Sequence, residues 1–503
     1  MLLKNLLPKD QNFNLLEEEL NKRIENIEID SRKVTQNSIF FALKGNATNG
    51  IKFIDKAIQN GANIIICSID EIPKIDKNIT LIKTKNPHDL LVFMLQKFYS
   101  NLPKNIFAVT GTNGKTSVAE FCRQILEILG KKAATIGTLG VNIADLKVKE
   151  KLIDNSLTTP DLVTLYKNLS ILKEHKVDYV IIEASSIGLE QGRLDGIDFK
   201  VAAFTNFSQD HLDYHQNMDE YFSSKMILFK KNLAQNSLAV INCDDKKFDE
   251  IKEICSKNKL ELVSYGKNQA NFQIFSLKED SNFQDISLSI NGKIYDFKIS
   301  LLENFQATNI ICALAIISSY LKLGEEETTK LVNDLINLTC VNGRMEKIAT
   351  LENNAKIYID FAHSPDALEN LLTMAKKQAK GRLIVVFGCG GDRDAKKRPL
   401  MGKITSELAD IAIITDDNPR TENAAKIRKE IIAGIENKTK IGNKIIEVEK
   451  RKEAIKKAIS LLKQDDILII AGKGHEKYQI IGDKYFSFDE KEIILEFISI
   501  FKL

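Results

Sequence analysis

The chain lacks the features that mark zinc-binding, secreted and membrane-spanning proteins. Its seven cysteines form no CxxC pair, and several stand inside apolar runs, which predicts reduced core residues and neither a zinc site nor a disulfide framework. The longest apolar stretch, near residues 310–317, is far shorter than the roughly 20 residues of a membrane span. Pro8 interrupts the first apolar residues before a signal-peptide hydrophobic region could form. We therefore expect a cytoplasmic protein with no membrane insertion.

The chain also carries little net charge. A net charge of +3 over 503 residues is too small to predict a basic stripe that binds nucleic acid or a basic surface that binds membranes. An anionic small molecule could still be bound locally. The hydrophobic share of 44% and the charged share of 28% are typical of a globular protein. At this length roughly three domains of about 150 residues each are expected.

Short β-branched runs alternate with helical patterns along almost the whole chain, which predicts an α/β class with parallel sheets. No fixed-period repeat or low-complexity linker marks the boundaries, so the pattern alone sets them. We expect three domains over residues 1–100, 101–341 and 342–503. In the second, a helix should cover residues 115–129 and stop at Gly130, and Asn291-Gly292 predicts a hairpin turn.

Four apolar runs in the third expected domain each end in a polar cluster. They read KIYIDFAH, RLIVVFGCGGDRD, DIAIITDDNPR and DILIIAGKGHE. Ligands of open parallel sheets bind outside the carboxyl ends of the strands, so the four clusters should share one edge and form parts of one site. Asp417, Asn418 and Arg420 of the third run could equally form only a turn, because Asp, Asn and Pro are common turn residues.

The stretch GTNGKTS at residues 111–117 follows a predicted strand and opens a predicted helix. In that setting backbone N–H groups and the helix N-terminus can cradle phosphates. Lys115 would reach the β- and γ-phosphates, and the Thr116 hydroxyl would bind Mg²⁺. Val109 stands where the full Walker pattern has glycine, which leaves the shorter GTxGKT form. The alternative is a glycine-rich βα turn without a ligand.

Two further residues could serve a metal. Glu183 ends the run VDYVIIE, and an acid there is often only a solvated strand end, but the neighbouring P-loop favours a carboxylate that faces Mg²⁺. His211 in NFSQDHLDYH could bind a second Mg²⁺, although imidazole is an uncommon Mg²⁺ ligand and a capped polar turn is the alternative. By spacing alone, Lys225 is a surface lysine.

Two stretches could hold a polar substrate but are ambiguous when each is taken alone. SSIGLEQGRLDG offers Ser185, Gln191 and Arg193 directly after the Glu183 strand, and TTP offers Thr158 and Thr159. Loops contain such residues whether or not they bind anything.

Taken together, these motifs occur in the order found in Mur ligases. They are GTNGKT, TTP, EASS followed by Q-x-R, DH-x-DYH with a lysine downstream, NGRME, FAHSPD, GCGGDRD-x-x-KRPLM, DNPR and GKGHE. Over residues 27–480 the chain resembles this family, and within it most closely the members that use diaminopimelate. The resemblance implies three domains: an N-terminal one for the uridine nucleotide, a central ATPase with a P-loop sheet, and a Rossmann-like C-terminal one for the amino acid.

The resemblance further implies a cytoplasmic ligase of peptidoglycan precursor synthesis, hence of cell-wall formation and cell division. Mg²⁺ would be its cofactor and ATP its co-substrate. ATP would phosphorylate the D-glutamyl γ-carboxylate of UDP-MurNAc-L-Ala-D-Glu, and an amine of meso-diaminopimelate would then attack the acyl phosphate. Catalysis of this kind rests on positioning and on neutralisation of the γ-phosphate charge. Members of the family are usually monomeric.

The family's site residues map onto this chain by position. The implied ATP-binding set is Gly111, Thr112, Asn113, Gly114, Lys115, Thr116, Ser117, Asn309, Arg344 and His363. The implied UDP-MurNAc-dipeptide set is Ile29, Ser31, Asn46, Ala47, Thr48, Thr158, Thr159, Ser185, Gln191 and Arg193. The implied Mg²⁺ ligands are Thr116, Glu183 and His211. The implied catalytic set is Lys115, Glu183, His211 and Lys225, the last matching the lysine that the family carbamylates to N6-carboxylysine. The implied diaminopimelate set is Arg393, Asp417, Asn418, Pro419, Arg420, Gly472 and Glu476.

Four positions depart from the family pattern. Leu157 replaces the Asn that often precedes the two threonines, which puts one sugar contact in doubt. Gln306 stands in the usual Phe-Asn-x-x-Asn stretch, whose leading Gly is also missing, and this could alter the adenine pocket. Phe361 stands where Tyr is frequent and Asn342 where Pro is common.

Two rival functions remain open at this point. A sister ligase could add lysine or act as a folylpolyglutamate synthetase. Lysine has no distal carboxylate and lysine-adding relatives lack the Arg of DNPR, while TTP with EASS and Q-x-R favours a muramoyl substrate. A P-loop binding module without ligase activity is the second rival, and the agreement of so many motifs speaks against it.

Overall fold

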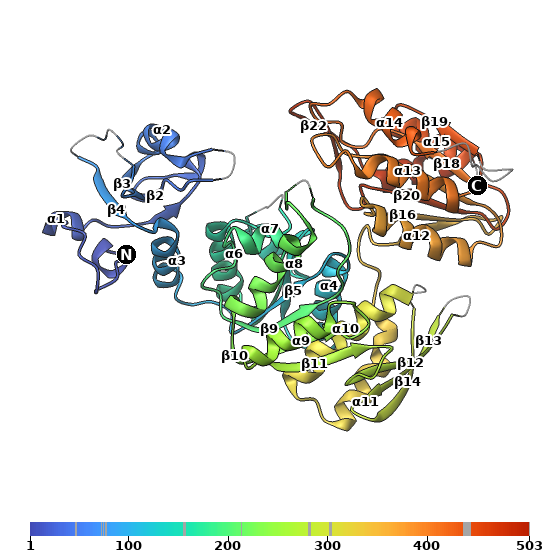
Figure 1. Ribbon diagram of the computed structural model, residues 1–503, viewed down its shortest axis with the longest axis horizontal. Coiled ribbons are helices and arrows are strands. Elements are labelled where there is room, and N and C mark those ends of the chain that lie inside the picture. The colour runs from blue at the N-terminus through green and yellow to red at the C-terminus, as the bar shows by residue number, and fades with distance from the viewer. Residues whose placement is uncertain are drawn as a thin grey trace.

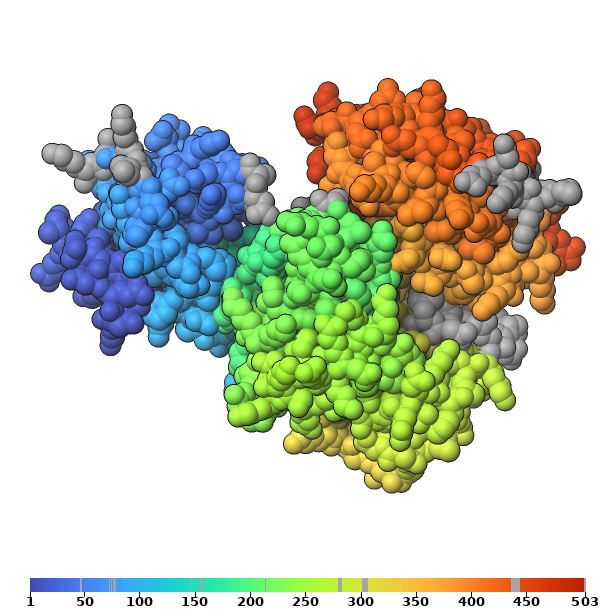
Figure 2. All heavy atoms as spheres, in the orientation of Figure 1, coloured from blue at the N-terminus to red at the C-terminus, as the bar shows by residue number. Residues whose placement is uncertain are grey.

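The computed structural model describes residues 1–45, 48–71, 73, 75, 78–153, 157–212, 214–279, 283–300, 304–435 and 444–501. They form three lobes, each built on its own main sheet, with the second lobe between the other two (Figure 1). In the space-filling view the first and third lobes each lie against the second (Figure 2). The α/β class expected from the sequence is confirmed.

The first lobe is a parallel sheet in the order β1-β2-β3-β4. Its strands are β1 (Asn26–Glu28), β2 (Ser38–Phe41), β3 (Ala62–Ser68) and β4 (Thr80–Thr84), and its helices are α1 (Glu17–Leu20), α2 (Ile54–Gln59) and α3 (Pro87–Phe98). Pro87 pre-sets the first turn of α3, and the Asn86 side chain caps it. Met94 and Leu95 of α3 belong to the same buried cluster as Leu165 of the second lobe, so this helix anchors the first lobe to the second.

The second lobe holds a sheet in the order β14-β13-β12-β11-β10-β9-β5-β8-β6-β7, parallel from β12 through β6. Its strands are β5 (Asn105–Thr110), β6 (Ala133–Gly137), β7 (Gly140–Asn142), β8 (Tyr179–Glu183), β9 (Phe199–Phe204), β10 (Leu233–Asn242), β11 (Glu261–Gly266), β12 (Phe272–Glu279), β13 (Gln284–Ile290) and β14 (Lys293–Ile299). Its helices are α4 (Lys115–Ile128), α5 (Leu146–Lys149), α6 (Leu162–Glu174), α7 (Ser186–Glu190), α8 (Met218–Ile227), α9 (Phe248–Lys257), α10 (Asn304–Leu321) and α11 (Glu325–Asp334). Because β5 and β8 are neighbours, the loops that follow them share one edge of the sheet.

Two local predictions for the second lobe are confirmed. Helix α4 ends at Ile128, and Gly130 has φ +71°, the left-handed conformation expected after a helix end. Asn291 and Gly292 join β13 to β14 with φ of +49° and +92°, as a two-residue hairpin turn with positive φ at both positions requires.

The third lobe holds a sheet in the order β15-β16-β20-β17-β18-β19, parallel from β16 to β19. Its strands are β15 (Glu346–Thr350), β16 (Lys356–Asp360), β17 (Leu383–Phe387), β18 (Ile411–Ile414), β19 (Lys444–Glu447) and β20 (Ile467–Ala471), with a separate hairpin of β21 (Tyr478–Ile481) and β22 (Lys484–Ser487). Its helices are α12 (Pro365–Gln378), α13 (Lys397–Leu408), α14 (Ala424–Ala433), α15 (Arg451–Ser460) and α16 (Glu490–Phe501). The four apolar runs singled out in the sequence are β16, β17, β18 and β20, so their polar clusters do share one edge.

Helices cover both faces of the second and third sheets, which explains the continuous apolar runs of their strands. The residues of β20, for example, are all buried. All seven cysteines are free, as expected. Within the described ranges, no helix combines the length and the apolar character that a membrane span would need.

A buried ion pair fixes two helices of the third lobe. The Arg451 side chain is 0% exposed and that of Glu490 1%. Arg451 Nε donates to Glu490 Oε1 at 2.6 Å, and Nη2 donates to the Ala471 carbonyl at 2.7 Å. The pair therefore ties the first residues of α15 and α16 to the end of β20.

Replacing Arg451 should destabilise the third lobe. We expect Arg451→Met to lower the free energy of unfolding by about 3–5 kcal/mol, because it leaves Glu490 buried without its partner. Urea unfolding followed by circular dichroism measures the loss. The adjacent Lys450 is exposed, so Lys450→Met should stay within about 0.5 kcal/mol of the wild type. Equal midpoints for the two variants would contradict this account of the ion pair.

Candidate active site

The loop between β5 and α4 has the geometry of a phosphate-binding loop. Gly114 is the N-cap of α4 with φ +87°, and Gly111 has φ +142°, conformations that glycine adopts at little cost. A Cβ on Gly111 would lie 1.9 Å from Thr205 Oγ1, so no other residue fits there. The loop lines a cavity of about 920 Å³, to which the N-terminus of α4 presents its backbone N–H groups.

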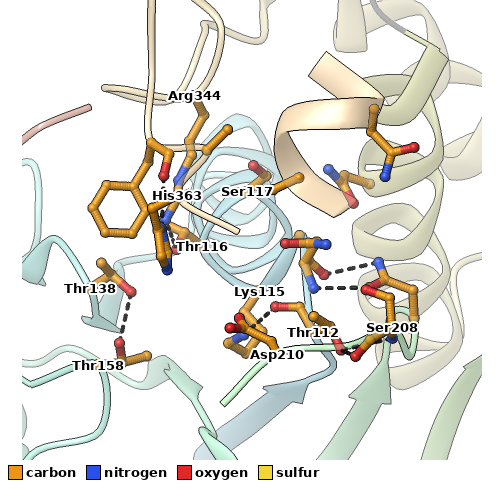
Figure 3. Close-up of a pocket in the computed structure, with 18 of the residues that line it drawn as sticks. Thr112, Lys115, Thr116, Ser117, Thr138, Thr158, Ser208, Asp210, Arg344 and His363 are labelled. Atoms are coloured by element: carbon orange, nitrogen blue, oxygen red, sulfur yellow. Dashed lines mark hydrogen bonds between the residues drawn. The ribbon is translucent and has the colours of Figure 1, made fainter. Parts of the chain in front are cut away.

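Lys115 is held by the loop itself. Its Nζ donates to the Gly111 carbonyl at 2.9 Å and to the Thr112 carbonyl at 2.7 Å. Burial lowers the pKa of Lys115, and the Coulombic attraction of Glu183 and Asp210 opposes that shift. Asp210 lies beside Lys115 in the cavity (Figure 3). A phosphate group would offer the ammonium more negative charge than two carbonyls do.

Glu183, at the end of β8, connects the P-loop helix to the loop after β6. Its Oε2 accepts from Thr116 Oγ1 at 2.9 Å and from Thr138 Oγ1 at 3.0 Å, while Oε1 accepts from the Thr138 N–H at 2.8 Å. Burial raises the pKa of Glu183, and the nearby Arg344 and Lys115 oppose the rise. A Cβ on Gly137 would lie 2.0 Å from Glu183 Oε1, so that glycine makes room for the carboxylate.

The oxygens of Thr116 and Glu183 fit a Mg²⁺ ion. This hard cation prefers oxygen ligands and is usually bound by one or two carboxylates together with waters and phosphate oxygens. Across the described ranges no group of three or more His, Cys, Asp or Glu side chains could hold a metal ion. Water and substrate oxygens would therefore supply the rest of the coordination.

The loop after β9 brings His211 and Asp210 into the same cavity. His211 adopts φ +54°, and its Nε2 lies 3.7 Å from Asp210 Oδ2. Burial alone would raise the pKa of Asp210, but His211, through its side chain and its backbone N–H, and the positive charge of Lys397 lower it. Asp210 is thus held as a carboxylate close to Lys115.

Lys225 is not on the surface, so the interpretation from spacing alone is wrong. It is 1% exposed on α8, its Nζ donates to the Gly111 carbonyl at 2.8 Å, and it lies 4.3 Å from the centre of the Tyr221 ring. Burial, reinforced by Lys115, lowers its pKa well below the usual value, and Asp210 opposes the shift. Lys225 thus points from α8 into the protein interior and contacts the P-loop at Gly111.

The third lobe supplies the opposite wall of the cavity. Arg344 Nη2 donates to Thr116 Oγ1 at 3.0 Å (Figure 3). The Arg344 guanidinium lies 4.5 Å from the centre of the Phe361 ring. His363 lies nearby and is half-buried, and the loss of solvation, reinforced by Lys397, lowers its pKa to about 4. Lys397 Nζ also donates to the His363 carbonyl at 2.8 Å. His363 is therefore neutral near pH 7.

The candidate muramoyl-peptide residues of the second lobe gather next to Glu183. Thr159 Oγ1 donates to the Glu183 carbonyl at 2.7 Å and lies 3.0 Å from Ser185 Oγ. Arg193 Nη1 donates to the Thr159 carbonyl at 2.8 Å, and its Nε donates to Gln191 Oε1 at 3.0 Å. Thr158, Thr159, Ser185 and Arg193 line the cavity. Leu157, one of the departures, lines it too and is 44% exposed.

The other candidates for this substrate belong to the first lobe. Ile29, Ser31 and Thr48 lie there, away from the residues that line the cavity. Asn46 and Ala47 lie outside the described residues. The structure therefore leaves the proposed uridine contacts as predictions.

The amino-acid candidates cluster at the carboxyl edge of the third sheet. Asn418 Nδ2 donates to Glu476 Oε2 at 2.9 Å. Asp417 lies against Gly472, where a Cβ would come within 2.8 Å of Asp417 Oδ2, and its Oδ2 is 3.6 Å from Arg451 Nη1. The motif acid Asp417 thus faces the buried Arg451.

Arg420 and Arg393 complete this cluster. Arg420 adopts φ +52°, and its Nη1 donates to the Gly391 carbonyl at 2.9 Å. The Pro419 residue that precedes it is buried. The Arg420 backbone N–H donates to the Ile480 carbonyl, and the Arg420 carbonyl accepts from the Gly482 N–H, which ties the loop to the hairpin. Arg393 is exposed, with Nη1 donating to the Asp392 carbonyl at 3.1 Å.

Several cavity residues were not predicted. Asp210, which lines the cavity, and Lys397, which bonds the carbonyl of the cavity residue His363, stand in motifs quoted from the sequence and could have been singled out as charged motif positions. Asn370 and Lys377 line the cavity from α12, and no sequence motif marks them. Gln306, regarded only as a departure, is fully buried and donates from Nε2 to the Arg344 carbonyl at 3.2 Å, so it helps to place that arginine.

Comparisons with known proteins agree along the whole chain. The profile of the Mur ligase middle domain matches residues 109–317, that of the Mur ligase glutamate ligase domain matches 343–474, and that of the Mur ligase family catalytic domain matches 23–99. The UDP-N-acetylmuramoyl-L-alanyl-D-glutamate--2,6-diaminopimelate ligase of Rickettsia conorii is 40% identical over 481 residues, which are 95% of this chain and 96% of that protein.

Two solved structures extend the comparison. A structure of UDP-N-acetylmuramoyl-L-alanyl-D-glutamate--2,6-diaminopimelate ligase has a TM-score of 0.68 at 30% identity and covers 100% of this chain and 99% of that one. The MurF ligase from Thermotoga maritima in complex with ADP has a TM-score of 0.61 at 18% identity and covers 94% and 96%, a likeness that concerns the fold alone.

Two histidines, His363 in the cavity and His475 against the cavity residue Phe361, predict a loss of stability in mild acid. Burial lowers the pKa of both His363 and His475 to about 4, so between pH 6.5 and 4 the unfolded chain binds more protons than the folded one. The free energy of unfolding should therefore fall as the pH drops through this window, by up to about 1.4 kcal/mol per pH unit for each histidine.

Unfolding in urea at pH 7, 6, 5 and 4.5 measures the slope, and His363→Gln should make it shallower. His175→Gln, at a partly exposed position outside the cavity lining, serves as the control and should leave the slope as it is. A slope that His363→Gln does not change would contradict the neutral state of His363 in the folded protein.

Proposed function

The chain belongs to the Mur ligase family, and from this premise we propose that it joins meso-2,6-diaminopimelate to the D-glutamyl γ-carboxylate of UDP-MurNAc-L-Ala-D-Glu. It is an ATP-dependent, ADP-forming ligase. The observation that supports the substrate most directly is one cavity in which the P-loop and the Thr116–Glu183 pair lie beside Thr158, Thr159, Ser185 and Arg193. A phosphoryl donor and the carboxylate that receives the phosphoryl group would meet there.

In the first step the γ-phosphoryl group would pass to the γ-carboxylate. The P-loop N–H groups and Lys115 would hold the phosphates. Arg344 and His363 would contact the nucleotide from the third lobe, and Asn309, which lies beside Gly114, would contact it from the second. Thr116 and Glu183, with His211 nearby, would hold Mg²⁺, which neutralises phosphate charge. Neutral His363 can donate or accept one hydrogen bond without adding a charge.

In the second step an amine would attack the acyl phosphate. The cluster around Arg420 and Glu476 would hold the amino acid so that one amine reaches the second lobe. Because phosphate and amino-acid residues belong to different lobes, closure of the third lobe on the second would bring them together. A scattering profile that ATP and substrate leave unchanged would argue against closure.

Lys225 is proposed to carry a carbamate that supports a second Mg²⁺. Carbamylation needs a neutral amine, which attacks CO₂ and releases a proton. The burial that lowers the pKa of Lys225 favours that neutral form. Its place beneath Gly111 is close to where metal and phosphates would bind.

The proposed preference for meso-diaminopimelate over lysine follows from the charges that the two amino acids carry. Meso-diaminopimelate carries a second carboxylate and a second ammonium at its far end, whereas lysine lacks the carboxylate. Arg420 and Arg393 offer guanidinium groups, which bind carboxylates in a fixed fork, and Glu476 offers an acceptor for the ammonium. Leaving such a guanidinium without its carboxylate disfavours lysine.

The division of labour among domains is part of the proposal. Residues 1–100 would bind the uridine part through Ile29, Ser31 and Thr48, residues 101–341 would bind ATP, and residues 342–503 would bind the amino acid. We place the enzyme in the cytoplasm as a monomer, in the synthesis of peptidoglycan precursors, where it would serve cell-wall growth and division.

An amino-acid panel tests the reaction and its specificity together. Phosphate release with ATP, Mg²⁺ and UDP-MurNAc-L-Ala-D-Glu should depend on meso-diaminopimelate and be much slower with L-lysine. Arg420→Met should raise the KM for meso-diaminopimelate by about 10–100-fold, because a charge-assisted hydrogen bond is lost. Activity with L-lysine should change little in the same variant. A wild-type preference for L-lysine would overturn the proposed substrate.

A second test concerns the carbamate. Lys225→Ala should lower kcat by about 10–100-fold, the usual cost of losing a group that supports a metal ligand set. A ¹³C carbamate resonance should appear after incubation with ¹³C-bicarbonate and be missing in Lys225→Ala. Lys230→Ala, exposed and nearby in the chain, should keep both the rate and the resonance. Full activity in Lys225→Ala would refute this role.

A further inference from the structure

Besides Arg451, a second buried cation, Lys473, contacts the amino-acid cluster from the protein interior. It stands in the loop after β20, and its side chain is 0% exposed. Its Nζ donates to Asn418 Oδ1 at 3.0 Å and to Glu476 Oε2 at 3.1 Å. One ammonium thus contacts two of the candidate amino-acid residues, and the Mur ligase resemblance assigned it no role.

The ammonium decides which way the Asn418 amide points. A lysine ammonium can only donate hydrogen bonds, so the Asn418 atom that faces it must be the carbonyl oxygen. The Ile480 N–H donates to the same oxygen at 3.0 Å. The amide nitrogen is thereby directed to Glu476, to which it donates at 2.9 Å.

The same arrangement sets the direction of the Glu476 carboxylate. Both Lys473 and Asn418 donate to Oε2, so this oxygen is fixed toward the protein. The side chain is 20% exposed, and Oε1 is the oxygen that remains for an incoming donor. Without Lys473 only the Ile480 N–H would still hold the Asn418 oxygen, and Glu476 Oε2 would lose one of its two donors.

Glu476 and Arg420 both contact Asn418, whose Nδ2 donates to Glu476 Oε2 at 2.9 Å and whose backbone carbonyl oxygen lies 3.5 Å from Arg420 Nη1. The Tyr478 ring is 5.7 Å from Lys473 Nζ, and the pKa of Tyr478, raised first by burial, is raised further by Glu476 and lowered by Arg420. An acceptor and a cation therefore both contact Asn418, and both act on the pKa of the Tyr478 hydroxyl. That pairing is complementary to an ammonium and a carboxylate carried by the same ligand.

We propose that Lys473 is a positioning residue that orients the Asn418 amide and, through it, fixes Glu476 Oε1 toward the ammonium of the incoming amino acid. The role rests on the proposed function insofar as Glu476 binds the amino acid. It requires neither a particular amino acid nor any contact between Lys473 and the substrate.

A double-mutant cycle tests this role. Lys473→Met should raise the KM for the amino acid that the wild type uses fastest by about tenfold or more, because a hydrogen bond to a charged group is lost. The KM values for ATP and UDP-MurNAc-L-Ala-D-Glu should stay within about twofold, and kcat at saturating amino acid within about threefold. In the Glu476→Gln background the same substitution should add less than about threefold, because Lys473 acts through Glu476.

Lys477→Met is the matched control. Lys477 stands four residues later with a side chain that is 77% exposed, so its replacement should leave every KM unchanged. Thermal melting and ADP binding, measured on each variant, show whether it is folded. Should Lys473→Met not fold, the cycle is run with Lys473→Gln, where a neutral amide replaces the cation and at least a threefold rise in amino-acid KM is expected.

Two results would overturn the role of Lys473. One is an unchanged amino-acid KM in a folded Lys473→Met or Lys473→Gln variant. The other is a full multiplicative effect in the Glu476→Gln background, which would indicate a structural contribution independent of Glu476. A wild type that ignores meso-diaminopimelate but uses another amino acid would refute the proposed substrate alone, and the cycle is then read with that amino acid.

Discussion

The burial of one carboxylate, Glu183, organises the cavity. It is 2% exposed, and a buried charge is tolerated only where several donors compensate it. Those donors come from Thr116 on α4 and Thr138 after β6, and Arg344 of the third lobe reaches the same Thr116 hydroxyl. Each of these segments must therefore be positioned so that its donor reaches Glu183, at the end of β8, or Thr116. The P-loop, the central sheet and the third lobe share this single anchoring point.

A comparable arrangement of buried charge supports the amino-acid cluster. Arg451 faces both Glu490 and Asp417, and Lys473 bonds Asn418 and Glu476. The helices of the third lobe thus determine where its motif loops point. Residues far apart in the sequence, such as Asp417 and Glu490, belong to one electrostatic unit. The loops can be polar and shaped for a ligand because the layer beneath them balances their charge.

Much of this fold could be predicted from the sequence, since parallel strands buried on both faces must be apolar runs and must end in polar loops. The shared edge of the four motif strands followed from that rule alone. Contacts made by lone side chains could not be predicted. Lys225 had the spacing of a surface residue, and only the packing of α8 under Gly111 buries it. Asn370 and Lys377 on α12 carry no local signal, because the approach of the third lobe to the second brings them into the cavity.

Four loop residues around these sites, His211, Met345, Asp392 and Arg420, adopt φ between +50° and +54° although none is glycine. A left-handed conformation costs such residues about 1–2 kcal/mol each, which the surrounding bonds must offset. The consequence concerns protein engineering for heat resistance. Glycine at these positions would relieve strain, but it would also free the backbone that directs a functional side chain. The gain in melting temperature and the loss of activity would come from the same four substitutions.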